Sequence, residues 1–286
     1  MITSYEIQVA VLLLVGLAYA LFDILNNRNV PDAFVYLTLA IGVVCAFAFN
    51  YGSISIDLVL ALVVGAIGYA FYRAGLLGGG DVAEFVFVSL LMPIQKNPLF
   101  IGMYQLPVPF IISVLIAAVF AALIYIPAYY LGIKGMKLRW IMPSVKSRRS
   151  AGLMLLSYAI FIVILEFSIG LGIAGVLFIA ILAAASALIV LFEQQIYLGM
   201  VSLIYPKELD EGDMIAVSLM SRSDLSYFKK RSRFGRLATR KLISQIKNVR
   251  RKIPVYKDSV PFAFFMFIGI VVSLALGNIL LIALGI

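Results

Sequence analysis

Long runs of hydrophobic residues, separated by short polar segments, make up most of the chain. A helix crosses the hydrocarbon core of a bilayer with about 20 consecutive apolar residues. Runs of this length recur, and we expect them to form membrane-spanning helices at 5–25, 33–50, 54–74, 107–131, 151–169, 171–192 and 260–284. A further run, 82–93, is shorter, and it rises only about 18 Å against a core of about 30 Å. The pattern predicts an all-α polytopic membrane protein with about eight transmembrane helices.

Composition agrees with this pattern and divides the chain into four parts. Sixty-three per cent of the residues are hydrophobic and 13% are charged, which excludes an ordinary soluble domain. We expect a membrane core at 1–131, a basic loop with two further spans at 132–192, a polar segment at 193–258 and a C-terminal transmembrane helix at 259–286.

The basic residues indicate which side of the membrane each loop faces. With eight spans, the loops 23–32, 72–81, 132–150 and 193–258 fall on one side, and they carry all of the 23 Lys and Arg residues except Lys96. Loops rich in Lys and Arg stay in the cytoplasm. We therefore expect a multi-pass protein of the cell membrane whose basic loops lie beside the anionic leaflet, with membrane lipid as a partner.

The polar segment 193–258 contains two further patterns. Residues 209–217 read as a turn entering a strand, which predicts a small β element. Farther on, apolar residues recur at helical spacing among seven Lys and Arg residues of 236–252, at Ala238, Leu242, Ile246 and Val249. This spacing predicts a basic amphipathic helix on the membrane surface. Nucleic-acid binding is not favoured, because no recognition motif accompanies the charge.

The residues that are absent exclude several kinds of chemistry. The chain has no histidine, and Cys45 is its only cysteine. Structural zinc of the Cys/His type and nucleophile pairs that depend on histidine are therefore excluded, and we expect no metal. Cys45 lies in the middle of an apolar run, where a packing role is expected. If the protein is an enzyme, carboxylates must carry out most of the chemistry.

Two carboxylates occur at the same expected membrane level. The loop Gly78-Gly79-Gly80-Asp81 connects the third apolar run to the short run 82–93, and Asp23 lies near the cytoplasmic end of the first run. The first helix runs inward and the short helix runs outward, so both carboxylates lie at the cytoplasmic end of the membrane. An ionisable side chain in such a place indicates a functional site.

Each of these acidic residues also has a purely structural explanation. Asp81 followed by Glu84 matches a capping box at a helix start. Asp23 fits a carboxylate that reaches the membrane interface. Asp57, near the opposite end of the third run, is expected to be a solvated group at a helix end.

Asp23, Val30-Pro31 and the Gly78-Gly79-Gly80-Asp81 motif together resemble the type IV prepilin peptidase family of intramembrane aspartyl proteases. The family pattern is an Asp followed some eight residues later by Ile-Pro, with a downstream Gly-x-Gly-Asp. Here Val30 replaces Ile, Val82-Ala83-Glu84 replaces the usual start with Lys-Leu, and the cysteine tetrad of bacterial members is absent. The chain is more similar to the archaeal branch, the preflagellin and prepilin peptidases, over about residues 5–130.

The resemblance implies a function. Members of this family remove class III signal peptides from pilin and archaellin precursors at the cytoplasmic membrane surface, with two catalytic aspartates. These correspond to Asp23 and Asp81 here. The resemblance to the archaeal branch implies no cofactor, and the sequence contains no evident S-adenosylmethionine site.

Further residues receive expected roles within this function. Gly78, Gly79 and Gly80 would admit an extended substrate backbone close to the second aspartate. Asp32 and Glu84 are candidates for contacting the basic leader of the precursor, although a turn and a helix cap explain them equally well.

The local helix ends suggest how the two aspartates divide the work. Facing carboxylates share one proton, because both cannot ionise at low cost. The C-terminus of the first helix disfavours a charge on Asp23, whereas a helix N-terminus favours one on Asp81. We therefore expect Asp81 to be the base and Asp23 the acid.

Two other functions remain open. A presenilin or signal-peptide-peptidase type of aspartyl protease shares Gly-x-Gly-Asp, but its usual Tyr-Asp pair is missing, since Phe22 precedes Asp23. A transporter or assembly factor could use intramembrane carboxylates for ion coupling. Cleavage of a precursor separates both proteases from this third function.

Overall fold

The computed structural model describes residues 3–26, 30–74, 77–94, 98–99, 108–133, 142–232, 234–257 and 261–285. These residues form two compact units. The membrane unit comprises the described parts of 1–129, 142–192 and 261–286, and the polar unit comprises those of 130–141 and 193–260. Each unit is described by itself.

Six helices of the described residues are long and apolar enough to cross a membrane. They are α1 (Ser4–Leu25), α2 (Asp32–Phe49), α3 (Ile54–Arg73, preceded by a 3-10 turn at Tyr51–Ser53), α5 (Phe110–Pro127, continued by a π-helix at Ala128–Ile133), α6 (Val145–Ile169) and α7 (Ile173–Leu191). The prediction of a helical membrane protein is confirmed. The count of eight is not, because α4 (Gly79–Leu91) and α11 (Phe262–Leu276) are shorter.

The predicted span 260–284 is not one continuous helix. It divides into α11 and α12 (Ile279–Leu284). Gly277 between them has φ 85°, which side-chain-bearing residues rarely adopt. The Asn278 side chain then accepts hydrogen bonds from the N–H groups of Leu280 and Leu281 at 3.1 and 3.3 Å, which caps the new helix.

Helix α4 is short, and protein surrounds it. It packs against α2 and α3, and Phe87, Val88 and Leu91 are almost fully buried. Its last carbonyls are satisfied by side-chain amides from other helices: Gln8 Nε2 donates to Leu91 O at 2.9 Å, and Asn50 Nδ2 donates to Leu90 O at 3.5 Å. These side chains provide donors for two carbonyl groups that the end of the helix leaves without an internal partner.

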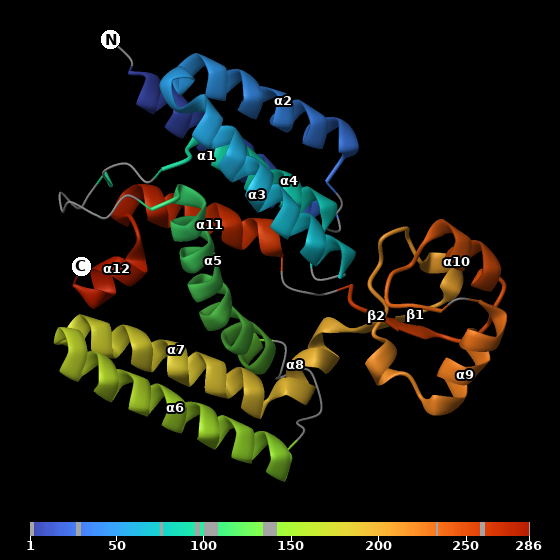
Figure 1. The fold of residues 1–286 in the computed structure, drawn as a ribbon. Helices are drawn as coiled ribbons and strands as arrows, with labels where there is room; N and C mark the ends of the chain where they lie inside the picture. The colour runs from blue at the N-terminus through green and yellow to red at the C-terminus, as the bar shows by residue number, and fades with distance from the viewer. Residues whose placement is uncertain are drawn as a thin grey trace. The chain divides into compact units, whose positions relative to one another are not determined.

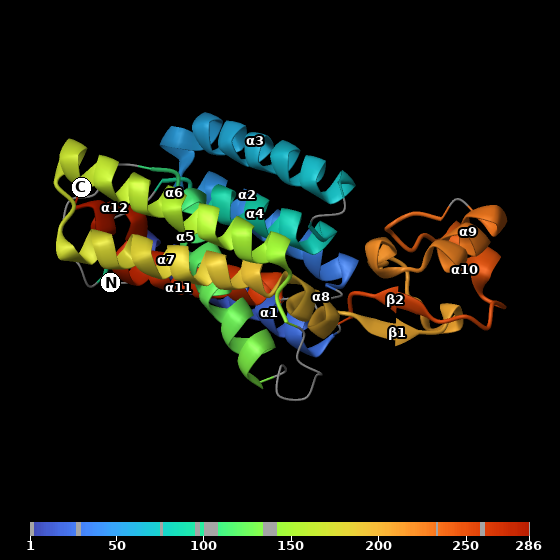
Figure 2. The same cartoon turned by 90° about the horizontal axis from the view of Figure 1, so that it is seen from below.

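Helix α11 packs against α1 and α5. A Cβ atom at Gly269 would lie 2.3 Å from the backbone oxygen of Val114, so only glycine allows α5 and α11 to approach this closely. Helices α6 and α7 form a hairpin and lie side by side in both ribbon views (Figures 1 and 2).

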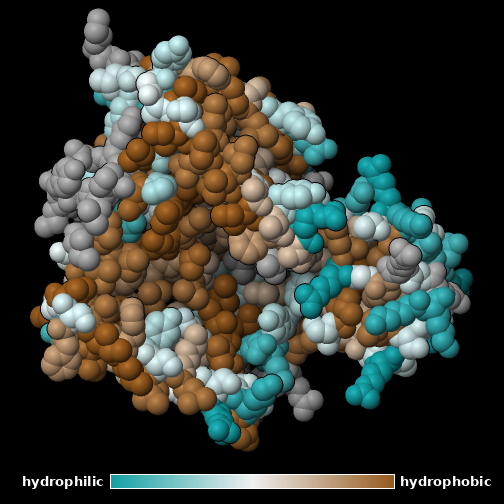
Figure 3. Space-filling model, in the orientation of Figure 1, coloured by the Kyte–Doolittle hydropathy of each residue, from teal (hydrophilic) through white to brown (hydrophobic). Residues whose placement is uncertain are grey.

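The outer surface of the membrane unit is apolar. Hydrophobic residues cover most of the face of this unit in Figure 3. In α6, Ala151 is the only buried residue, and Phe167 is 88% exposed. Helices with this surface face lipid.

The polar unit has its own small hydrophobic core and a two-stranded antiparallel sheet. Strand β1 (Ser202–Ile204) pairs with β2 (Ile253–Val255). Its helices are α8 (Glu193–Met200), α9 (Arg222–Arg231) and α10 (Arg240–Ile246), with 3-10 turns at Pro206–Glu208 and Val217–Leu219. The predicted strand at 209–217 contributes only isolated bridges, from Met214 to Leu237 and from Ile215 to Val255.

The structure corrects the prediction of a membrane-surface helix over 236–252. Helix α10 has seven residues, and the apolar stripe points inward: Ala238, Leu242, Ile246 and Val249 all belong to the core of the polar unit. The stripe is therefore not available to lipid.

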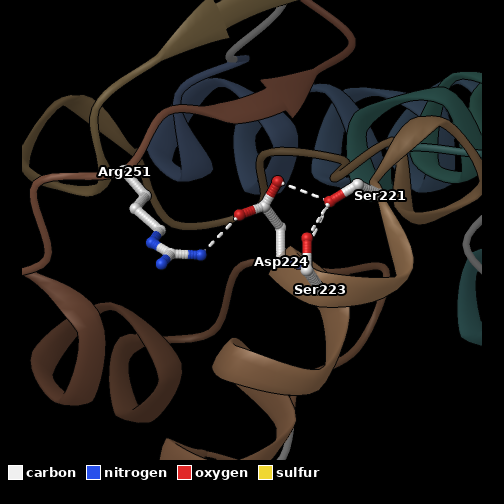
Figure 4. A network of polar contacts seen from close by, with 4 residues as sticks. All are labelled: Ser221, Ser223, Asp224 and Arg251. Atoms are coloured by element: carbon white, nitrogen blue, oxygen red, sulfur yellow. Dashed lines mark hydrogen bonds and ion pairs between the residues drawn. The ribbon is translucent and has the colours of Figure 1, made fainter.

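A network of polar contacts connects α9 to the segment before β2 (Figure 4). Asp224 accepts hydrogen bonds from Ser221 Oγ at 2.7 Å and from Arg251 at 2.8 Å, and Ser221 also lies 2.8 Å from Ser223 Oγ. The hydrogen bond from Ser221, followed by that from Arg251, holds the pKa of the Asp224 carboxyl below its usual value. Arg251 also stacks over Tyr227, 4.3 Å from the ring centre.

Candidate active site

Asp23 lies in the last turn of α1 and is buried, with 8% of its surface exposed. Its Oδ2 atom accepts a hydrogen bond of 2.9 Å from the backbone N–H of Ala263. Ala263 is the second residue of α11, so this N–H is one of those that a helix start leaves without an internal partner. The N-terminus of α11 therefore points at Asp23.

Asp81 lies in the first turn of α4 and is half-buried. The backbone N–H of Gly78, the residue before the helix, donates to Asp81 Oδ2 at 2.8 Å. The expected capping box of Asp81 and Glu84 is wrong, because α4 begins two residues before Asp81. Asp81 occupies the third helical position instead, from which its carboxylate caps the helix start.

Asp23 and Asp81 lie in the same part of the membrane unit, near enough for the charge of one to act on the other. They come from two helices of the membrane unit, and each lies at a helix end. Two like charges in a partly buried place repel each other, so we expect these two carboxyl groups to share a proton. We call these two residues the aspartate pair.

The structure removes the argument for Asp81 as the base and Asp23 as the acid. That argument assumed that the C-terminus of α1 disfavours a charge on Asp23. The N-terminus of α11 opposes that effect with a direct N–H donor, just as the N-terminus of α4 supports Asp81. Helix dipoles therefore favour a negative charge at either member.

Glu84 is a third carboxyl at this place. It lies one turn after Asp81 on α4, has no exposed surface, and is near enough to Asp81 and Asp23 for their charges to act on it. Neither of its carboxyl oxygens has a hydrogen-bond partner among the described residues. Glu84 is buried in this structure, whereas Asp32, the other candidate for contacting the leader, is exposed in the first turn of α2.

The three glycines differ in their surroundings. None has a positive φ, since the positive-φ glycines of the described residues are elsewhere. A Cβ atom at Gly80 would lie 2.9 Å from Val30 Cγ2, so Gly80 allows α4 to pack against the segment before α2. At Gly79 the nearest described atom would be Tyr72 Cε2 at 3.9 Å, an ordinary contact distance. Gly78 is exposed and donates to Asp81.

Tyr19 and Ala263 are two site residues that the sequence did not indicate. Tyr19 lies one turn before Asp23 on α1, is fully buried, and its hydroxyl lies 2.9 Å from Thr38 Oγ1. Its ring packs against Phe34, which fixes α1 against α2 beside the site. The spacing of four from Asp23 could have placed Tyr19 on the same helix face. No local signal could have indicated Ala263.

Asp57 corrects another expectation. It is fully buried rather than solvated, and its Oδ2 atom accepts a hydrogen bond of 3.4 Å from Ser53 Oγ. It lies in the first turn of α3, near the end of α4 that is opposite Asp81. Asp57 is therefore a buried carboxyl outside the site.

The residues that the structure describes hold no group of three or more His, Cys, Asp or Glu side chains placed to bind a metal. Comparison of the chain with protein-family models, with curated proteins and with solved structures found no match.

Proposed function

We propose that the protein is an intramembrane aspartyl endopeptidase of the prepilin peptidase type, which removes class III signal peptides from archaellin or type IV pilin-like precursors. The observation that carries the proposal is the aspartate pair. Asp23 and Asp81 are far apart in the sequence, yet each lies at a helix end and accepts a backbone N–H, near enough for their charges to act on each other, in a protein that has no histidine.

Proton sharing in the pair provides the chemistry. The ionised member takes a proton from a water molecule as that water attacks the scissile carbonyl carbon. The protonated member gives its proton to the carbonyl oxygen, which forms a neutral tetrahedral intermediate. When the C–N bond breaks, one member protonates the leaving nitrogen and the other takes the proton of a hydroxyl group. The pair ends with one proton, as it began.

The basic loops support a cytoplasmic active site in the cell membrane. Lys and Arg are concentrated in the loops on the side of the membrane where both aspartates are expected. This charge also favours contact with anionic lipid. Asp32 is an exposed acidic residue at the start of α2, so it is suited to contact the basic leader. Gly79 is exposed beside Asp81, where an extended substrate could approach.

A cleavage assay tests the proposal. Membranes that contain the protein are incubated with archaellin and pilin precursors, and the new N-termini are sequenced. We expect a cut at the junction between the leader and the hydrophobic helix, lost in Asp23→Asn and Asp81→Asn. Asp57→Asn is the matched control, because it removes a buried carboxyl outside the pair. Normal cleavage by either site variant would remove that residue from the pair.

A second function, proton-coupled transport, is favoured by Glu84. Ionisable groups buried at membrane depth without a partner are typical of proton pathways. Proteoliposomes loaded with a pH-sensitive dye test it. Solute-dependent proton uptake without cleavage of any precursor would replace the peptidase with a transporter.

A further inference from the structure

Strands β1 and β2 lie side by side in Figure 2, and one face of this sheet packs on the core of the polar unit. Ile204 of β1 contacts that core, which includes Ile253 and Val255 of β2. Successive side chains along a strand point to opposite faces. Leu203 and Tyr205, on either side of Ile204, therefore lie on the outward face, and they are 63% and 39% exposed.

Two lysines flank Tyr205 on this outward face. The register pairs Ile204 with Ile253, so Lys252 lies across from Tyr205, and its Nζ atom is 5.4 Å from the centre of the tyrosine ring. Lys207 Nζ lies 5.9 Å from the same ring centre. Both lysines are exposed, and neither forms an ion pair among the described residues. The surface made by these side chains is called the sheet patch: Leu203, Tyr205, Lys207 and Lys252.

The chemistry of the sheet patch matches the surface of an anionic bilayer. Tyrosine is enriched at the headgroup level of membranes, and lysine stems lie along apolar surface while their ammonium groups stay in the polar layer. Negatively charged lipids attract such cations. Glu208 accepts the N–H of Tyr205 at 3.4 Å, and the patch together with this acidic neighbour still carries a net positive charge.

The connections of the chain keep the sheet near the bilayer. Only α8 separates β1, which starts at Ser202, from α7, which ends at Leu191 and is long and apolar enough to cross a membrane. The connection from the end of β2 at Val255 to the start of α11 at Phe262 spans at most about 25 Å when fully extended. A sheet tied at both ends to helices of the membrane unit is within reach of the lipid headgroups.

We propose that the sheet patch docks on the bilayer surface. Leu203 and Tyr205 enter the headgroup layer, and Lys207 and Lys252 bind the phosphates of anionic lipids. The lipid contact of the polar unit is thus made by the outward face of the sheet and not by the apolar stripe of α10, which the core covers. This inference goes beyond the proposed peptidase activity and does not depend on it.

A spin label at position 203 of the full chain tests the proposal. Cys45 is the only cysteine, so Leu203→Cys in a Cys45→Ala background accepts a single nitroxide, which is itself apolar. The labelled protein is placed in nanodiscs of phosphatidylcholine, alone or mixed with phosphatidylglycerol. In the mixed discs we expect the label to be accessible to oxygen, which dissolves in lipid, and protected from a water-soluble nickel chelate. In phosphatidylcholine alone, accessibility to nickel should rise.

Replacing Lys207 and Lys252 together by Gln removes the cations of the patch. Each lysine near an anionic surface favours the bound state about fivefold, so the ratio of lipid-facing to water-facing label should fall about 30-fold in the mixed discs. The matched control replaces Lys241 and Lys247 by Gln, which removes the same charge from exposed positions at α10. This control should change the ratio much less. Equal falls in the two double variants would mean that only total charge matters, and they would overturn the role of the sheet patch.

Two other results would also overturn the proposal. A label that is open to nickel in the mixed discs would show that the patch stays in water. A label that is protected from nickel to the same degree in both lipid compositions would show that protein covers the patch, either a second copy of the chain or another segment. None of these measurements needs a cleaved precursor, so their outcome is independent of the test of the peptidase function.

Discussion

Asp23 and Asp81 each accept a hydrogen bond from a backbone N–H group at a helix start. Such bonds to a carboxylate are about twice as strong as bonds between neutral groups. They fix the carboxyl groups in place and support a negative charge on either member. Proton exchange within the pair then requires no rearrangement of the helices.

Replacement of either aspartate by asparagine should abolish cleavage and preserve the fold. The amide oxygen of Asn can still accept the N–H of Ala263 or Gly78, but it cannot take or give a proton. We expect kcat to fall by at least about 100-fold, the lower end of what general acid–base catalysis contributes. Thermal unfolding in detergent checks the fold, and an unchanged rate would contradict the assignment.

Gly80 should be needed for packing against Val30. A Cβ atom there would lie 2.9 Å from Val30 Cγ2, so Gly80→Ala should lower the melting temperature. Val30→Ala in the same chain should restore part of the loss, which a double-mutant cycle measures. Gly79→Ala is the control for stability, because its Cβ would meet only Tyr72 at 3.9 Å. If the two variants do not interact, the Gly80–Val30 contact has no energetic role.

The sequence suggested the aspartate pair from the expected topology. The first helix runs inward and ends near Asp23, and the short helix runs outward and begins near Asp81, so both residues are expected on the cytoplasmic side. It could not indicate that Glu84 is buried. Whether a side chain one turn into a helix faces protein or solvent depends on where the helix begins and on which neighbours pack there. Helix α4 starts at Gly79, and Glu84 in this helix is buried by its neighbours.

Helix α11 combines a packing role with a role at the site. Its N-terminus reaches Asp23, and its Gly269 lies against the backbone of Val114 in α5. The pairing of α11 with α1 and α5 could not be predicted, because apolar helices in lipid carry little sequence information about their neighbours. Small residues such as Gly269 are the main signal.

Gly269→Ala should separate α5 from α11 and lower both stability and activity. The added methyl would lie 2.3 Å from Val114 O, so a backbone must move and the Ala263 N–H moves with α11. Gly152→Ala in α6 is the control, because nothing lies within 4 Å of its Cβ position and alanine favours a helix. The melting temperature and the cleavage rate measure the effect. Equal results for both variants would show that the close approach has no energetic importance.

The apolar stripe of α10 shows why the spacing of residues does not identify what covers them. Residues four apart share a helix face whether that face meets lipid or protein. In the polar unit, β2 and α9 supply the covering surface, with Ile253 and Phe228 in the same core as Leu242. These partners come from separate parts of the segment, and the sequence alone did not place them.

Leu242→Ala should destabilise the polar unit by about 2–5 kcal/mol, the usual cost for a buried leucine. Limited proteolysis of the full chain in membranes should then cut within 193–257 at a lower protease concentration. Lys241→Gln is the control, because Lys241 adjoins Leu242 in the sequence but its side chain is exposed. If Leu242→Ala instead releases the polar unit from anionic vesicles and leaves protease resistance unchanged, the stripe binds lipid.

The two units of the molecule differ in the force that stabilises them. The membrane unit buries little of α6 and relies on lipid to cover it, whereas the polar unit buries its apolar residues in its own core. Hydrophobic runs predicted the first unit well, because lipid requires long apolar helices. They predicted the ends of the short helices poorly, because α4 and α11 are covered by protein and have no fixed length requirement.

The hydrogen bond from Ala263 to Asp23 has a consequence for biosynthesis. Its two residues are 240 positions apart, and the polar unit is made between them. Asp23 therefore leaves the ribosome long before the N–H group that holds it. During translation the nascent chain contains both aspartates but lacks the helix start that orients one of them. Under the proposed peptidase function, the site is therefore complete only after the last helices have inserted, and we expect the nascent chain not to cut neighbouring precursors before that point.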